Sequence, residues 1–212
     1  MSENRALMAQ CQAALRANGF DVYPAKDPAQ ARYIFFEEIL PDVKADLISW
    51  ADSMTMEATG VLDELLADPA IPMIKTFDPE ASRQEMIERR RQALLADLFL
   101  TGSNAVTACG KLVNLDMIGN RTAAISFGPK KVVLFVGQNK IVPDLESAII
   151  RVRSVAAPLN AKRHQMSTPC TQTGRCHDCD SPQRICNTWS IIEKCFPVGR
   201  IKVVLIEGAW GL

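Results

Sequence analysis

Short apolar runs alternate with helical patterns along this chain, and that alternation constrains the possible folds more than any other feature. Runs of strand length lie at residues 20–25, 46–51, 71–77, 97–102, 132–137 and 200–208. Patterns typical of helices lie at residues 1–19, 27–40, 54–68, 78–96 and 142–159. Because wholly apolar strands separated by helices are typical of parallel sheets buried on both faces, we predict an α/β fold with a mostly parallel sheet flanked by helices.

Aspartate–proline pairs mark where two of these helices are expected to begin. In Asp27-Pro28 and again in Asp78-Pro79, the carboxylate can cap the first turn and the proline suits the first helical position. Residues 103–131 break the alternation because they are rich in Gly, Asn and Thr, which predicts a small β-hairpin insertion. If the hairpin strands around 105–127 are exposed, they could support a homodimer.

The composition excludes several classes of protein. The 212 residues are 48% hydrophobic and 23% charged, and 24 Lys and Arg balance 24 Asp and Glu. Such a chain has no basic field to attract nucleic acid, and none of its apolar runs approaches the roughly 18 residues of a membrane span. The N-terminal segment lacks the apolar region of a signal peptide. We therefore expect a cytoplasmic protein with a single domain over residues 1–212 and without nucleic-acid or membrane partners.

Two loops that follow predicted strands are the expected ligand-binding region, since open α/β sheets bind ligands at the carboxyl ends of their strands. The first contains Ser53 and Thr55, whose hydroxyls could contact an anion or cap the next helix. The second, with the segment after it, supplies Gly102, Ser103, Asn104, Thr107, Asn120 and Arg121. Arg121 could hold a carboxylate bidentately, whereas the Gly and Asn residues could equally serve turns.

Four of the seven cysteines lie in a cysteine-rich loop at residues 169–186, before the last predicted strand. They are Cys170, Cys176, Cys179 and Cys186, in the spacing C-x5-C-x2-C-x6-C. The C-x2-C pair is a typical chelating unit, and its polar surroundings argue against apolar filler. A disulfide is the weakest interpretation in a reducing compartment. The spacing fits an iron–sulfur cluster or a zinc ion without separating the two, and His177 is an alternative ligand.

One long segment resembles a known family. Residues 100–142, "LTGSNAVTACGKLVNLDMIGNRTAAISFGPKKVVLFVGQNKIV", closely resemble the signature of the LUD (lactate-utilisation) domain family. "DSMT" at residues 52–55 resembles the GGSMT segment of that family, and the tail resembles its cysteine-bearing branch. The resemblance implies a fold similar to that of NagB, RpiA and the CoA transferases. It also implies a place beside iron–sulfur partner subunits in a system that oxidises lactate to pyruvate.

The chain departs from the family pattern at two places. Many members have T-E-(D/T)-G where this chain has Thr107-Ala108-Cys109-Gly110, so an acidic side chain that could act as base or nucleophile is missing. In the first loop, Ala51-Asp52 replaces two glycines, and the Asp52 carboxylate would repel an anion. Transferase or isomerase chemistry is therefore the least favoured activity.

Two other functions are expected in its place. The first is an accessory protein of organic-acid oxidation, which binds a small organic acid or a sugar-like ligand at the strand-end loops and holds a cluster through its cysteines. The second is a non-catalytic assembly subunit in which the same cysteines hold a structural zinc.

Overall fold

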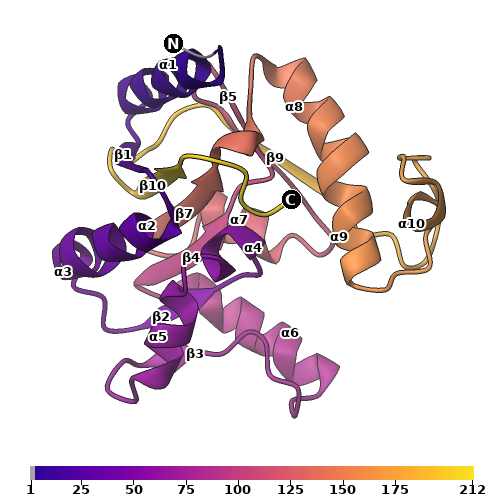
Figure 1. Ribbon diagram of the computed structural model, residues 1–212. Helices are drawn as coiled ribbons and strands as arrows, with labels where there is room; N and C mark the ends of the chain where they lie inside the picture. Colours follow the sequence, from indigo (N-terminus) through magenta and orange to yellow (C-terminus); the bar gives the residue numbers. More distant parts are fainter. Residues whose placement is uncertain (1–2) are drawn as a thin grey trace.

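The computed structural model describes residues 3–212, and side chains from residue 5 onward. A central sheet of six parallel strands confirms the predicted α/β architecture (Figure 1). In spatial order, its strands are β1 (Asp21–Ala25), β10 (Ile201–Ile206), β7 (Lys131–Gly137), β4 (Leu98–Gly102), β2 (Ile48–Trp50) and β3 (Met73–Ile74). All residues of β2, β4 and β10 are buried, which explains why these runs are mostly apolar, with Ser49, Thr101 and Lys202 as the polar exceptions.

Helices cover both faces of this sheet, and alternate residues of each strand contact opposite layers. On one face, Val133 and Phe135 of β7 pack against α2 (Pro28–Ile34), the helical turn that follows it, and α5 (Val61–Ala67). On the other, Val132, Leu134 and Val136 pack against α1 (Glu3–Ala17) and α7 (Asn120–Ser126). This two-sided burial is the main source of stability for the central strands.

A second, mixed sheet lies on the face that carries α1 and α7. Its strands, in spatial order, are β8 (Ile141–Val142), β5 (Ala105–Thr107), β6 (Leu112–Asp116) and β9 (Thr188–Ile192). The predicted hairpin is present as the antiparallel β5–β6 pair, but it is part of this larger sheet. The two hairpin strands, β5 and β6, are buried beneath α8 (Leu145–Arg151). They therefore lack the exposed surface through which a homodimer was expected to form.

Several predicted boundaries were wrong. The helix expected at 78–96 is α6 (Arg83–Gln92), which begins at Ser82 because a reciprocal capping box with Glu85 outweighs the Asp78-Pro79 signal. The predicted hairpin region also contains α7, and β9 follows the cysteine-rich loop before the last strand. The segment predicted at 54–68 forms two helices, α4 (Met54–Glu57) and α5, because Gly60 between them adopts a positive φ of 71°.

Prolines interrupt two helices without ending them. A π-helical turn at Phe35–Ile39 leads into α3 (Leu40–Val43), and a second at Val152–Ala156 joins α8 to α9 (Ala157–Arg163). Proline lacks an N–H and its ring would clash with the carbonyl four residues earlier, so the wider turn accommodates Pro41 and Pro158. The second π-turn forms part of the site described below.

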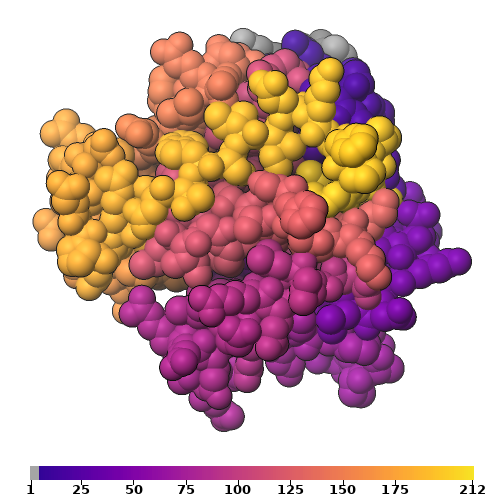
Figure 2. All heavy atoms as spheres, turned by 180° about the vertical axis from the view of Figure 1, so that it is seen from behind, coloured from indigo at the N-terminus to yellow at the C-terminus, as the bar shows by residue number. Residues whose placement is uncertain are grey.

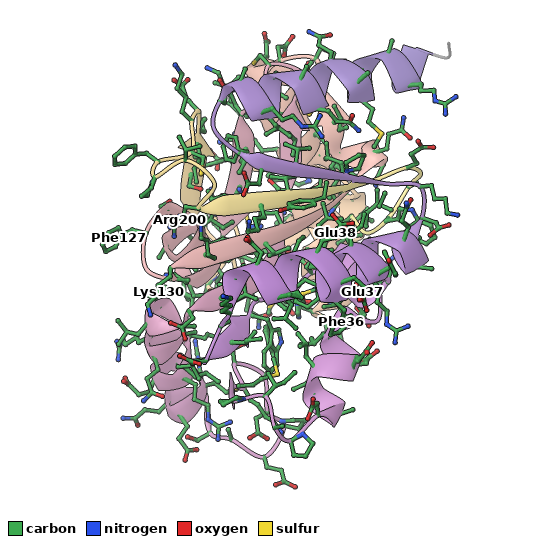
Figure 3. The ribbon with its side chains drawn as sticks, turned by 90° about the vertical axis from the view of Figure 1, so that its left-hand side faces the viewer. Phe36, Glu37, Glu38, Phe127, Lys130 and Arg200 are labelled. Atoms are coloured by element: carbon green, nitrogen blue, oxygen red, sulfur yellow. The ribbon has the colours of Figure 1, made fainter. Side chains whose placement is uncertain are left out.

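The two ends of the parallel strands have different surroundings. At the amino ends of β7 and β10, Lys130 and Arg200 lie near Phe127, which is 86% exposed and projects into solvent (Figure 3). Beyond the carboxyl end of β7, the C-terminal residues Gly208 and Trp210 donate backbone hydrogen bonds to the side chains of Gln138 and Asn139, at 3.1 Å each. No helix among residues 3–212 has the length and apolar character needed to cross a membrane.

Candidate anion site at the carboxyl ends of the strands

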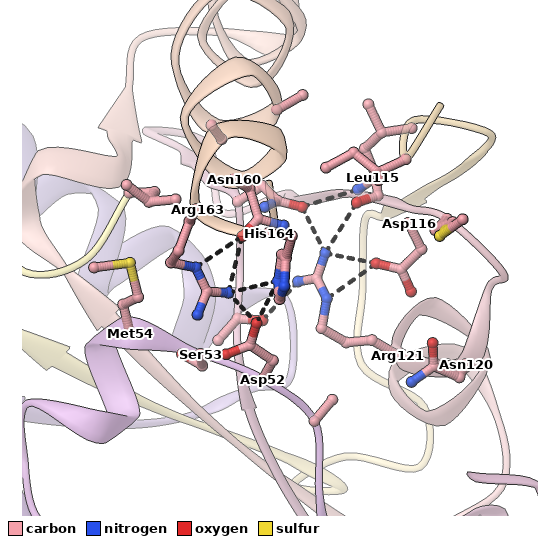
Figure 4. Close-up of a pocket in the computed structure, with 18 of the residues that line it drawn as sticks. Asp52, Ser53, Met54, Leu115, Asp116, Asn120, Arg121, Asn160, Arg163 and His164 are labelled. Atoms are coloured by element: carbon pink, nitrogen blue, oxygen red, sulfur yellow. Dashed lines mark hydrogen bonds and ion pairs between the residues drawn. The ribbon is translucent and has the colours of Figure 1, made fainter. Parts of the chain in front are cut away.

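A cavity of about 340 Å³ lies where the carboxyl ends of β2 and β4 meet the end of β6 (Figure 4). Its floor comes from the loops after these strands, and one wall comes from the π-turn before α9. Apolar side chains contribute much of the lining: Met54, Phe77, Leu115, Met117, Ile118, Val152, Met166, Ile185 and Leu212. The lining residues with ionisable side chains are Asp52, Arg90, Asp116, Lys140, Arg163 and His164, together with Arg121.

Arg121 is the structural centre of the floor, because all five of its N–H donors can be matched to protein acceptors. The acceptors, at 2.6–3.3 Å, are the carbonyls of Gly102 and Leu115, the side-chain oxygens of Asn104 and Asn114, and the Asp116 carboxylate. Asp116 also accepts a 2.7 Å hydrogen bond from the backbone N–H of Thr122. Arg121 thus ties α7 to β6 and to the end of β4 with the connection that follows it, and it would have to release one of these acceptors to bind a carboxylate.

Asp52 has an ion pair that the sequence did not reveal. Its carboxylate pairs with Arg163 of α9, and the same oxygen lies 3.1 Å from Nε2 of His164 (Figure 4). Arg163 is also held by the side-chain oxygen of Asn160, at 2.9 Å. The negative charge that was expected to repel an anion is therefore balanced by a partner 111 residues away.

Two cationic side chains that line the cavity have no acidic partner among the described residues. Arg90 stacks on Phe77 with 5.1 Å between guanidinium and ring centroid, and its buried Nε lacks a hydrogen-bond partner. Lys140 is only 5% exposed, and no described residue accepts a hydrogen bond from its amine. Burial, reinforced by the positive charges of Arg151 and Arg121, lowers the pKa of Lys140 to about 7.

Six of the eight predicted ligand-binding residues, all except Thr55 and Thr107, line this cavity. Ser53 does so while also capping α4, since its hydroxyl accepts a 3.3 Å hydrogen bond from Met56 N. Gly102 leaves essential space, because a Cβ there would lie 2.5 Å from the Ser53 hydroxyl. Thr55 instead donates to the Trp210 carbonyl at 2.8 Å, and the buried Thr107 accepts from Lys111 N.

Lys140 and Arg90 line the cavity but were not predicted as ligand-binding residues from the sequence. Lys140 follows the predicted strand at 132–137, so the rule about carboxyl ends of strands could have selected it. Arg90 lies in a helix with no buried residues and with basic side chains on successive positions, so no sequence pattern distinguishes its inward direction. Asp52 was identified in the sequence, but nothing local predicts that it pairs with Arg163.

The cysteine-rich loop projects beyond α9 at one side of the molecule (Figures 1 and 2). It includes the short helix α10 (Pro169–Thr173), and all four cysteines are free thiols of intermediate exposure. No group of three or more potential ligands in residues 3–212 has metal-binding geometry. His177, the alternative ligand, lies 2.7 Å from the Thr173 hydroxyl.

Electrostatics nonetheless link the four thiols. Burial raises the pKa of the Cys186 thiol, and the neighbouring thiols of Cys170, Cys176 and Cys179 raise it further, while Arg184 lowers it. Arg184 also donates to the carbonyls of Cys179 and Cys186, at 2.7 and 3.0 Å. Within the C-x2-C pair, the backbone N–H of residue 178 points to the Cys176 sulfur at 3.4 Å.

The cysteine-rich loop and the cavity share a wall. Met166 and Ile185, which line the cavity, lie on the two chain segments that enter and leave the loop. Ser181 and Gln183 of the loop hydrogen-bond to the backbone of Ser167, at 3.0 and 2.7 Å, and so close its base. A change in the order of the loop would therefore reach the cavity through Ile185.

The fold and this strand-end cavity define an α/β protein with a polar, cation-rich site. The chain matches the model of the LUD domain over residues 8–206, and it belongs to that family. It is similar in structure to a DUF162 family protein from Deinococcus radiodurans, with a TM-score of 0.55 and 15% identity, covering 98% of this chain and 100% of that one. At this identity the likeness shows the fold alone. The search of curated proteins gave no match.

Proposed function

We propose that this chain is a cytoplasmic accessory protein of organic-acid oxidation, with lactate and pyruvate as the first candidate ligands, and that it binds a small organic anion in the strand-end cavity. The proposal rests on two cationic side chains of the lining, Lys140 and Arg90, which have no acidic partner among the described residues. The other charges of the lining are balanced. An anionic ligand would supply the hydrogen-bond acceptor and the counter-charge that Arg90 and the protonated form of Lys140 lack. Membership of the LUD family makes an acid of lactate metabolism the first candidate.

The charge pattern favours an acid over a neutral sugar-like molecule. Asp116 and Asp52 are each neutralised by an arginine, so the free charges in the cavity are positive. The apolar wall, which includes Val152 and Ile185, would contact the carbon skeleton of the ligand. A carboxylate with a short apolar body satisfies both surfaces.

A ligand panel tests this proposal. Thermal unfolding would be followed with lactate, pyruvate, a phosphosugar and the neutral lactamide, because a ligand that binds only the folded state raises the midpoint. We expect a concentration-dependent increase with lactate or pyruvate and none with lactamide. Equal shifts with lactate and lactamide, or no shift with any acid, would contradict the anion site.

The second part of the proposal is that Cys170, Cys176, Cys179 and Cys186 hold a metal centre. The influence of the three neighbouring thiols on the pKa of Cys186 supports it, as does the N–H directed at the Cys176 sulfur, an interaction that stabilises thiolates. An iron–sulfur cluster would favour a place beside iron–sulfur partner subunits, whereas a zinc ion would favour the assembly role.

Metal analysis of protein purified without oxygen separates these alternatives. About four irons with sulfide per chain, and visible absorption bleached by dithionite, would indicate a cubane cluster. About one zinc per chain without a visible band would indicate a structural site. Protein that binds neither metal would contradict this part of the proposal. So would a metal content that stays the same in a variant with all four cysteines changed to serine.

A further inference from the structure

Lys140 differs from the other deeply buried lysine of this protein. Lys202, whose side chain is 3% exposed, lies 2.9 Å from Asp21 and 3.0 Å from Asp42. Those carboxylates offset burial and raise its pKa. Lys140 is almost as buried but has no acceptor among the described residues. Its amine borders the cavity instead of an internal ion pair, so its nitrogen lone pair is available to a bound molecule.

The groups around Lys140 favour the neutral form of its amine. Arg151 is fixed by hydrogen bonds to the carbonyls of Asn104 and Asn139, at 2.6 and 3.1 Å, and Arg121 is fixed by its own acceptors. Both positive charges oppose protonation of the Lys140 amine. The backbone at Gly211 covers the amine, since a Cβ placed there would lie 3.3 Å from Nζ. The amine thus combines a neutral form near pH 7 with limited access to water.

We infer that Lys140 is a nucleophile that forms a reversible imine with the carbonyl carbon of a small oxo acid bound in the cavity. A neutral, desolvated lysine is the form that attacks carbonyl groups. The carboxylate of the same molecule would be held by Arg90, the other unpaired cation of the lining. The inference rests on the proposed anion site, and it narrows the ligand from an organic acid to one with a carbonyl group beside its carboxylate.

The reaction balances without an oxidant or reductant. The amine nitrogen bonds to the carbonyl carbon, and a proton moves from nitrogen to the former carbonyl oxygen to give a carbinolamine. Loss of that oxygen as water, with the second amine proton, leaves the carbon–nitrogen double bond. Hydrolysis reverses both steps. A hydroxy acid such as lactate has no carbonyl carbon to attack, so it would bind in the cavity without forming this bond.

Reductive trapping tests the inference on the intact protein. The protein would be incubated with pyruvate and then with borohydride, which fixes an imine as a stable secondary amine, and the adduct would be located by peptide mass spectrometry. We expect one principal adduct, at Lys140, and near-complete loss of it in Lys140→Met. Lys130→Met, at a lysine whose side chain is 79% exposed, should keep it, and lactate should give none.

Calorimetric titration of the same samples separates this inference from the function on which it rests. Binding of pyruvate without an adduct at Lys140, or with adducts spread equally over surface lysines, would overturn the imine and leave the anion site standing. Absence of binding by both pyruvate and lactate would overturn both. A circular dichroism spectrum and thermal midpoint like those of the parent protein would establish that Lys140→Met is folded.

Discussion

At the scale of single residues, the site depends on the contrast between a saturated arginine and an unsaturated lysine. Arg121 has a protein acceptor for every donor, whereas Lys140 has none among the described residues. The sequence identified Arg121 as a candidate ligand for a carboxylate, because side-chain chemistry is visible in a sequence. The number of acceptors already engaged is not, since it depends on the packing of β4, β6 and α7.

Removing Arg121 should destabilise the whole protein. Its pair with Asp116 is largely buried, with side chains 12% and 7% exposed, and loss of one partner of a buried pair typically costs about 3–5 kcal/mol. We expect Arg121→Ala to lower the free energy of unfolding by about that amount in urea titrations. Arg91→Ala, at a side chain 72% exposed, is the matched control and should cost less than about 0.5 kcal/mol. Equal effects of the two changes would contradict the structural role.

Lys140 should make stability depend on pH in a predictable direction. Its pKa in the folded state is about 7, against an ordinary value of 10.5, so between these values the unfolded chain binds more protons. The free energy of unfolding should therefore rise with pH across this window, relative to that of Lys140→Met, which lacks the titrating amine.

Urea unfolding of the parent protein and of Lys140→Met at several pH values measures this pH dependence directly. The difference in unfolding free energy between the two proteins should change with pH, in favour of the parent as the solution becomes alkaline. A difference that is constant from neutral to alkaline pH would show that the amine titrates normally.

At the scale of elements, the strands were easier to predict than the helices. Each predicted strand overlaps an observed one, because a short apolar run between helical patterns is typical of a strand buried in a parallel sheet. The helix boundaries failed where local signals competed, as at Asp78 and Ser82. The small strand β9 has mixed exposure and lacks an apolar run, so its pairing with β6 depends on the tertiary structure. The π-turn at Val152–Ala156 could be predicted only if it were known that Pro158 stays within a helix.

A metal held by the four cysteines, as proposed, should order the cysteine-rich loop. If Cys176 and Cys179 are ligands, their joint change to serine should release the metal and increase hydrogen exchange across residues 167–187, because the metal would add cross-links to those that the hydrogen bonds of Ser167 and Arg184 already provide. Ligand affinity should also fall, since Ile185 lines the cavity. Cys109→Ser, at an exposed cysteine outside the loop, is the control. Exchange that is unchanged in the double variant would argue against a metal-ordered loop.

At the scale of the whole molecule, the parallel sheet explains why the candidate site could be located before its chemistry. The strands β2 and β4 are neighbours and point the same way, so the loops after them must meet. Four of the predicted lining residues follow from that rule: Ser53, Gly102, Ser103 and Asn104. The opposing wall does not, because Arg163 and His164 approach from a helix far along the chain. The charge balance of the cavity is therefore a property of the assembled fold.

Calorimetric titration can measure whether a small carboxylate binds to the unpaired cations of this cavity. The better-binding acid of the panel would be titrated into the parent protein and into two matched pairs of variants: Arg90→Gln with Arg91→Gln, and Lys140→Met with Lys130→Met. A charged hydrogen bond contributes about 1.5–3 kcal/mol, so Arg90→Gln and Lys140→Met should each raise Kd by about tenfold or more, while the two controls leave it unchanged. Equal Kd values for all five proteins would place the ligand elsewhere and contradict the account.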